Sequence, residues 1–239
     1  MATRPSPVAA SAIARDLDLP RSTVHHLLNT LAAHGFVLHL REEQRWGLGT
    51  TAFELAGGFA RQQPLARLGR PLIAALADRV GESAHLAVMS GSDVLYIVEE
   101  RAPRRPALVT DVGVRLPAHL TATGRAMLAV LPREQVLALY PDASAFPSRT
   151  GLGPSRPSEL RELLRSIRAT GFATEAGEVS SGLSSVGVAV TDRSDWPVAA
   201  VAVTWPDDLG ARPEIGELAA VVAATASELA LRLQGRTGN

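Results

Sequence analysis

Apolar residues recur at helical spacing twice near the start of the chain. The second of these segments has apolar residues at positions i, i+3, i+4 and i+7, namely Val24, Leu27, Leu28 and Leu31. This spacing predicts a helix with one face against a core. A first helical segment, 9–15, precedes it, and the linker 17–20 ends in Pro20, which suits the first turn of a helix because its missing N–H would be unpaired there. The pattern predicts a helix-turn-helix.

Polar residues occupy the opposite face of the second predicted helix. Short or planar polar groups suit phosphates and base edges in a major groove. The predicted DNA contacts on this helix are Arg21, Ser22, Thr23, His25, His26 and Asn29. A solvated face of an ordinary amphipathic helix is the alternative interpretation of the same pattern.

The next residues change from helical to alternating periodicity. Gly35 is expected to end the helix, and 36–40 and 45–48 are expected to form two short strands joined at Glu42 and Glu43. Helix, turn, helix and hairpin together predict a winged helix over residues 1–49. Arg41 and Arg45 lie on the predicted wing, where we expect them to contact the DNA backbone.

The rest of the chain mixes helical and alternating patterns. A connector helix is expected over 50–63, with Phe53 and Phe59 on one side, and a second domain over 64–239. The domain's expected helices are 65–80, 123–131, 132–140, 158–169 and 213–233, with Ser158 as a cap and Gly171 as a stop. Its expected strands are 83–89, 94–99, 184–192 and 198–205. This order predicts an α+β domain in which helices cover an antiparallel sheet.

Three segments resemble the IclR family of bacterial transcriptional regulators. They are LPRSTVHHLLNTLAAHGF at 19–36, LPAHLTATGRAMLAVLP at 116–132 and GFATEAGEVSSGLSSVGVAVTDRSDWPVAAVAV at 171–203. The resemblance implies operator DNA as a partner and a C-terminal GAF-like domain that binds a small effector. It also implies a further helix before residue 9, but only 1–8 precede that point, and Pro5 and Pro7 oppose a helix there. We therefore expect a winged helix that lacks its first helix.

The predicted effector site combines the residues' own chemistry with this resemblance. A helix is expected to begin beside Ala122, Thr123 and Gly124, and the free N–H groups of a helix start attract anions. Ser185 and Thr204 place hydroxyls in otherwise apolar strands, where they need a hydrogen-bond partner. The family resemblance implies six effector-contacting positions, which are Ala122, Thr123, Glu175, Ser185, Ala202 and Thr204. A carboxylic acid is the expected effector. Glu175 is longer than the Asp that the family implies, and Ala202 lacks a hydroxyl found in sensors of the smallest keto acids.

Composition restricts the class of protein. The 239 residues are 46% hydrophobic and 20% charged, which is typical of globular proteins. No segment approaches the roughly 20 apolar residues of a membrane span, no signal peptide is evident, and there is no cysteine, so we expect a cytoplasmic protein without disulfides. Residues 1–63 carry six Arg and five acidic residues, a net charge of 6 − 5 = +1. Because so weak a charge favours weak DNA binding by one copy, we expect a homodimer or homotetramer.

Motifs for catalysis are missing from the sequence. It contains no G-x-S-x-G, no P-loop and no G-x-G-x-x-G after a predicted strand, and neither His85 nor His119 has neighbours spaced for a metal. We therefore expect no enzyme activity, no catalytic residue, no metal and no cofactor. The sequence predicts a DNA-binding regulator controlled by a small molecule. The alternative is a sensor module whose truncated winged helix no longer reads DNA.

Overall fold

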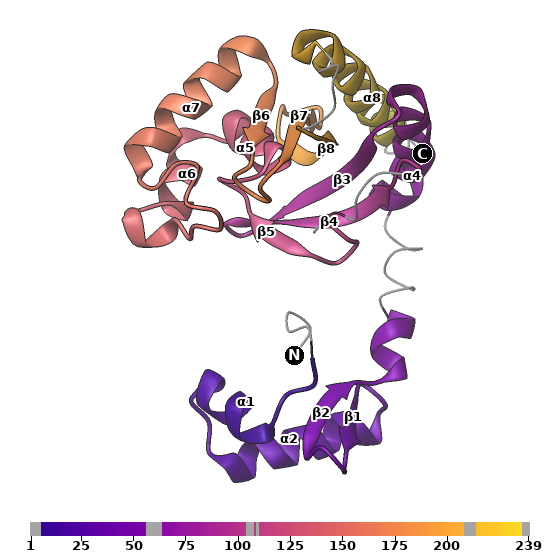
Figure 1. Cartoon of the computed structure of the whole chain (residues 1–239), viewed down its shortest axis with the longest axis vertical. Helices are drawn as coiled ribbons and strands as arrows, with labels where there is room; N and C mark the ends of the chain where they lie inside the picture. The colour runs from indigo at the N-terminus through magenta and orange to yellow at the C-terminus, as the bar shows by residue number, and fades with distance from the viewer. Residues whose placement is uncertain (1–5, 56–63, 104–107, 109, 208–213, 236–239) are drawn as a thin grey trace. The chain divides into compact units, whose positions relative to one another are not determined.

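The computed structural model describes residues 6–55, 64–103, 108, 110–207 and 214–235. The chain divides into two compact units, 1–63 and 64–239 (Figure 1). In the described parts of both units, no helix is long and apolar enough to cross a membrane.

The first unit is a helix-turn-helix followed by a two-stranded hairpin. Its elements are α1 (Ala10–Leu17), α2 (Arg21–Ala33), β1 (Val37–Leu40) and β2 (Arg45–Leu48). Val8 extends the hairpin, because its backbone N–H and C=O both bond to Trp46, at 2.9 and 2.8 Å. Residues 50–55 are helical, whereas 56–63, including Phe59 of the expected connector, lie outside the described residues.

The core of the first unit is small and corrects one expectation. Among the described residues of this unit, the buried cluster contains Ala14, Val24, Leu28, Val37 and Trp46. The sequence pattern predicts that Leu27 and Leu31 are buried as well, but they are 46% and 42% exposed. That prediction is wrong because, within the described part of the unit, α1 and β1 pack on the face of α2 that carries Val24 and Leu28.

The second unit is a six-stranded antiparallel sheet with strand order β5-β4-β3-β8-β7-β6. Its strands are β3 (Ser83–Ser90), β4 (Asp93–Glu100), β5 (Arg115–Pro117), β6 (Ala173–Ala176), β7 (Leu183–Thr191) and β8 (Pro197–Pro206). The sequence pattern does not predict β5 and β6. Both are short edge strands, and neither Pro117 nor the Ala-Thr-Glu-Ala of β6 gives a strong strand pattern.

Helices cover both faces of this sheet (Figure 1). The helices α4 (Pro64–Val80) and α8 (Ile215–Gly235) pack on one face, over a core that includes Ile73, Leu86 and Leu229. On the other face lie α5 (Ala122–Val130), α6 (Arg133–Leu139) and α7 (Pro157–Thr170), over a core that includes Met127 and Leu164. The α+β class and the antiparallel sheet covered by helices, predicted from the sequence, are confirmed.

The ends of α7 confirm one cap and correct another. Gly171 ends the helix with φ +82°, a left-handed conformation that glycine adopts without a steric cost. Ser158 is not the N-cap, because the helix begins at Pro157 after Arg156. Instead, the Glu159 carboxylate accepts a hydrogen bond from the Ser155 N–H at 2.9 Å. The predicted helix is correct, but its first turn is held by a different side chain.

Candidate functional site

The first candidate surface is the exposed side of α2. Val24 and Leu28 point into the core, and the rotation that buries them leaves the polar side chains exposed. The exposed residues include all six predicted contacts of this helix, Arg21, Ser22, Thr23, His25, His26 and Asn29. A helix with such a free polar face has the shape and chemistry to enter a major groove.

The hairpin supplies two further cations. Arg41 lies in the turn 41–44 between the strands, and Arg45 lies at the start of β2; both are exposed. Arg45 also donates a hydrogen bond from Nη1 to the Pro7 carbonyl at 3.1 Å. His39 stacks on Trp46, with ring centroids 4.4 Å apart. Among the described residues, Arg45 therefore has a structural contact that the Arg41 side chain does not make.

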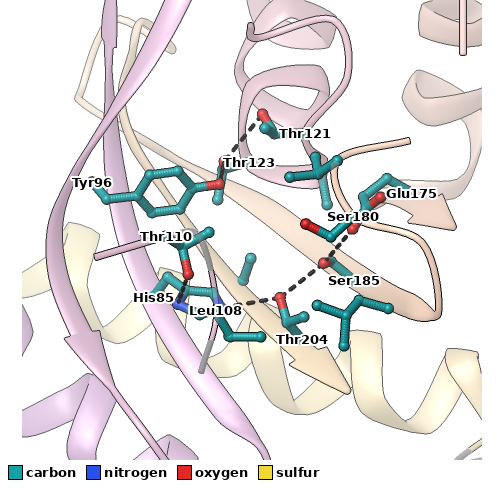
Figure 2. A pocket seen from close by; sticks show the side chains of 14 residues that line it. His85, Tyr96, Leu108, Thr110, Thr121, Thr123, Glu175, Ser180, Ser185 and Thr204 are labelled. Carbon is teal, nitrogen blue, oxygen red and sulfur yellow. Dashed lines mark hydrogen bonds between the residues drawn. The ribbon is translucent and has the colours of Figure 1, made fainter. Parts of the chain in front are cut away.

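The second candidate site is a cavity on the α5 side of the large sheet (Figure 2). Its walls come from five strands, from the beginning of α5 and from two segments between elements. The lining residues are His85, Tyr96, Leu108, Thr110, Thr121, Ala122, Thr123, Glu175, Val179, Ser180, Leu183, Ser185, Ala202 and Thr204. The cavity has a volume of about 20 Å³, which is enough for about one water molecule. A ligand larger than water therefore requires side chains to move.

A chain of hydrogen bonds crosses the floor of the cavity (Figure 2). Glu175 Oε1 accepts from Ser185 Oγ at 2.7 Å, and Ser185 Oγ lies 2.8 Å from Thr204 Oγ1. Thr204 Oγ1 lies 3.0 Å from His85 Nε2, and His85 Nδ1 lies 3.5 Å from Thr110 Oγ1. The chain joins an acid to an imidazole through two hydroxyls.

Sheet register explains this arrangement. Glu175 on β6 pairs with Ser185 on β7, which pairs with Thr204 on β8. Directly paired residues of neighbouring strands point to the same face of a sheet, so the three side chains form one row. His85 on β3 pairs with Ala202, two residues before Thr204 on β8, and therefore shares that face.

The beginning of α5 forms a second polar wall. Thr121 is the N-cap, and its Oγ1 accepts from the Gly124 N–H at 3.0 Å. Thr123 Oγ1 donates to Thr121 Oγ1 at 3.4 Å and lies 3.5 Å from the Tyr96 hydroxyl (Figure 2). The cavity thus contains several hydroxyls beside the positive end of a helix dipole.

Burial shifts the protonation of the two titratable groups on the floor. It raises the pKa of Glu175 to about 7, although the hydrogen bond from Ser185 opposes this shift. It also lowers the pKa of His85 to about 3, so the imidazole is neutral. Glu175 Oε2 is buried without a hydrogen-bond partner among the described residues. At neutral pH the floor therefore carries a buried carboxyl group that is partly protonated.

A buried cation, Arg125, is engaged outside the cavity. Arg125 on α5 forms an ion pair with Glu178 at 2.9 Å. Its guanidinium also donates to the carbonyls of His119, at 2.8 Å, and Thr174, at 2.7 Å. Since Thr174 precedes Glu175, this cation fixes β6 against α5. None of the lining residues carries a positive charge at neutral pH, because His85 is neutral.

The structure brings together six of the seven sequence-predicted effector residues, Ala122, Thr123, Glu175, Ser185, Ala202 and Thr204. Gly124, also predicted, is not part of the lining. A Cβ atom there would lie 2.3 Å from the Ala118 carbonyl oxygen, so this glycine permits close packing of α5 on the preceding segment.

The opposite side of the cavity is not predicted by the sequence pattern. His85, Tyr96 and Thr110 line it but were not predicted. The polar His85 within the otherwise apolar β3 was an available signal, since a buried polar side chain needs a partner. Tyr96 and Thr110 gave no comparable signal. In the described part of the chain, no group of three or more potential ligands is placed to hold a metal.

Comparisons with known proteins agree with this architecture. Two family models match, "IclR helix-turn-helix domain" over residues 1–40 and "Bacterial transcriptional regulator IclR C-terminal" over residues 58–231. The transcriptional repressor IclR of Escherichia coli is 28% identical over 230 residues, covering 95% of this chain and 84% of that protein. The glycerol operon regulatory protein of Streptomyces coelicolor is 31% identical over 194 residues, covering 81% and 75%.

A solved structure shows the same fold. It is an IclR homologue from Microbacterium hydrocarbonoxydans complexed with 4-hydroxybenzoate, with a TM-score of 0.75 and 22% sequence identity, covering 95% of this chain and 92% of that one. The family models together span nearly the whole chain, and the relatives' names describe regulators of transcription. This chain therefore belongs to the IclR family of transcriptional regulators, which pair a helix-turn-helix DNA-binding domain with an effector-binding C-terminal domain.

Proposed function

We propose that this chain regulates transcription in response to a small organic acid bound in the cavity of the second unit. The observation that carries this proposal is the buried polar row from Glu175 through Ser185 and Thr204 to His85, beside the beginning of α5. A buried row of hydroxyls beside a helix N-terminus matches the needs of an anion. The ligand would then favour one arrangement of the DNA-binding units over another.

The chemistry of the row narrows the ligand class. A ligand carboxylate can replace Glu175 as the acceptor for the Ser185 hydroxyl, and Thr121 as the acceptor for the Thr123 hydroxyl. Leu108, Val179 and Ala202 offer apolar walls. Glu175 opposes a second negative charge unless it is protonated, and its pKa of about 7 makes protonation accessible near neutral pH. A protonated Glu175 can also donate to a ligand oxygen. The ligand class that fits is a hydroxy acid or an aromatic acid.

A structural relative supports this class. The Microbacterium hydrocarbonoxydans homologue is complexed with 4-hydroxybenzoate, an aromatic acid with a hydroxyl group. Such a ligand exceeds the cavity's present volume of about 20 Å³, so its binding here requires side-chain movement. That movement is the physical route by which occupancy changes the surrounding elements.

Operator binding is assigned to the exposed face of α2 and the hairpin. The proposed contacts are Arg21, Ser22, Thr23, His25, His26, Asn29, Arg41 and Arg45. One recognition helix reads only a few base pairs, so we infer a dimer or tetramer that engages two or more half-sites. Light scattering at micromolar concentration should give a multiple of 25.2 kDa, and a monomer would contradict this inference.

Calorimetric titration of 4-hydroxybenzoate and other carboxylates tests the effector proposal. We expect binding that is lost in the double variant Ser185→Ala and Thr204→Val. Ser184→Ala is the matched control, because Ser184 is a neighbouring serine of β7 that bonds to Asp207 and does not line the cavity. Binding of uncharged apolar compounds only, unaffected by the double variant, would contradict the proposal.

The pH dependence of this binding is a second test. If Glu175 must be protonated, the carboxylate's Kd should rise towards tenfold per pH unit above about 7, because one proton is then taken up per ligand. Glu175→Gln replaces the ionisable carboxyl group with an amide and should make the Kd independent of pH in this range. A wild-type affinity that stays constant from pH 6 to 9 would separate Glu175 from the ligand.

The alternative is a sensor module that acts through protein contacts and not through DNA. The exposed Leu27 and Leu31 on α2 favour it, since a protein partner can cover them. A gel shift on the adjacent promoter distinguishes the two functions. Full-length protein that binds the effector but shifts no DNA would support the alternative.

A further inference from the structure

A second, larger cavity lies between α6 and α7, which are neighbours in Figure 1. Its volume is about 290 Å³, compared with about 20 Å³ for the effector cavity. Its floor is apolar: Leu160 and Leu164 of α7 are almost fully buried, and Leu137 of α6 is 42% exposed. This volume is sufficient for the body of a small organic ligand.

Three arginines line the same cavity. Arg133 comes from the first turn of α6, and Arg161 and Arg168 come from one side of α7. No acidic residue is among the lining residues. Within the described residues, none of the three arginines forms an ion pair, and Arg168 donates from Nε to the Ala129 carbonyl at 2.6 Å. An apolar floor thus carries three cations without a counter-charge.

This combination has a definite chemical complement. A guanidinium group can donate two parallel hydrogen bonds to a carboxylate or phosphate. An apolar ligand body that covers the exposed Leu137 removes apolar surface from water, which favours binding. A purely apolar ligand would leave the cations unused, and a small inorganic anion would leave the floor uncovered. An anion with an apolar body satisfies both parts of the cavity.

The two cavities lie at opposite ends of α5. Thr123, in its first turn, lines the effector cavity, and Leu131, its C-cap, lines the second one. The nine residues of α5 span about 13 Å at 1.5 Å per residue, so the two are separate sites. A ligand at one site therefore does not compete with a ligand at the other.

We propose that the α6–α7 cavity is a second ligand site, which binds a monoanion with an aliphatic or aromatic body. The site does not depend on the function proposed for the first cavity. Octanoate is a suitable test compound, because it combines one carboxylate with a chain that can cover the leucines. Octanol, which has the same chain length without the charge, is the matched control compound.

Titration calorimetry with the full-length protein tests the proposal. We expect octanoate to bind and octanol to bind at least several-fold more weakly. Arg133→Gln with Arg161→Gln should weaken octanoate binding roughly tenfold, the effect of two partly exposed charge contacts. Arg165→Gln is the matched control, since Arg165 is also an exposed arginine of α7 but does not line the cavity, and it should change little.

The outcomes separate this proposal from its alternatives. Loss of octanoate binding in Ser185→Ala with Thr204→Val, but not in the arginine variants, would place octanoate in the first cavity and overturn the proposal. An equal loss in Arg165→Gln would show general charge attraction and would also overturn it. A change of oligomeric state in the double variant Arg133→Gln and Arg161→Gln, without any loss of octanoate binding, would assign the surface to an interface between copies and would also overturn the proposal.

Discussion

The two units of this protein hold their candidate contact residues in opposite ways. In the first unit the eight proposed DNA contacts are exposed around a core of five buried residues. In the second unit the proposed effector contacts are themselves buried, and Glu175, Ser185 and Thr204 share hydrogen bonds between adjacent strands. Exposed contacts can therefore be replaced with little effect on folding, whereas a buried contact also belongs to the structure that positions it.

The largest expected effect is in the small core of the first unit. Trp46 is 4% exposed, and Trp46→Ala should destabilise this unit by about 3–5 kcal/mol, because a core of this size cannot refill the cavity. Differential scanning calorimetry should show loss of one transition while that of the second unit remains. Trp196→Ala is the control, since Trp196 is 45% exposed and its loss should cost about 0.5 kcal/mol or less. A single shared transition would contradict the independence of the units.

The next effect concerns the buried acid of the second unit. The folded chain holds the Glu175 proton up to about pH 7, whereas the ordinary pKa is 4.5, so its stabilising contribution is complete below pH 4.5 and is lost as the pH rises to about 7. Glu175→Gln cannot ionise. Relative to wild type, the variant should therefore gain up to about 3 kcal/mol between pH 4 and pH 8.

Urea unfolding of both proteins across this pH range measures the difference. His85, with its pKa lowered to about 3, acts in the opposite direction, because its contribution is lost as the pH falls below about 6.5. Both proteins contain His85, so its effect cancels in the comparison. A difference between them that stays constant with pH would show that Glu175 ionises normally.

A smaller effect separates two kinds of DNA contact. If the Asn29 amide reads a base edge, Asn29→Ala should reduce the discrimination between bases at one operator position by about 1–3 kcal/mol of binding free energy. Arg41→Gln should weaken binding to all DNA sequences alike and reduce the salt dependence of binding. The reason is that Arg41 is exposed in the turn and is proposed to contact phosphates. Arg41 is preferable to Arg45, which also bonds to Pro7. Equal losses on every sequence for both variants would contradict the assigned roles.

The smallest effect tests the orientation of α2. Leu27→Ala should change the free energy of unfolding by about 0.5 kcal/mol or less, since Leu27 is 46% exposed. Leu28→Ala, its neighbour in the sequence, should cost about 2–5 kcal/mol because Leu28 is 3% exposed. Equal losses measured by urea unfolding would mean that a partner or another segment covers Leu27.

Much of the second unit's fold was predictable because its elements are long and strongly periodic. Helix α4 and strands β3, β4, β7 and β8 follow their patterns within a few residues. The short edge strands β5 and β6 were missed, since three or four residues with Pro or Ala carry little periodic signal. β6 carries Glu175, so the one acidic residue of the cavity lining lies on a strand that the sequence pattern did not show.

The sequence alone determined which faces of the long elements are apolar and which short motifs indicate the family, because both depend on neighbouring residues in the chain. Only the tertiary structure decided that His85 and Tyr96 complete the cavity, that Gly124 is a packing residue, and that Leu27 is exposed. Each of these depends on which segment packs against the residue. Local periodicity shows that a face seeks a partner, but the register of distant strands determines which side chains meet there.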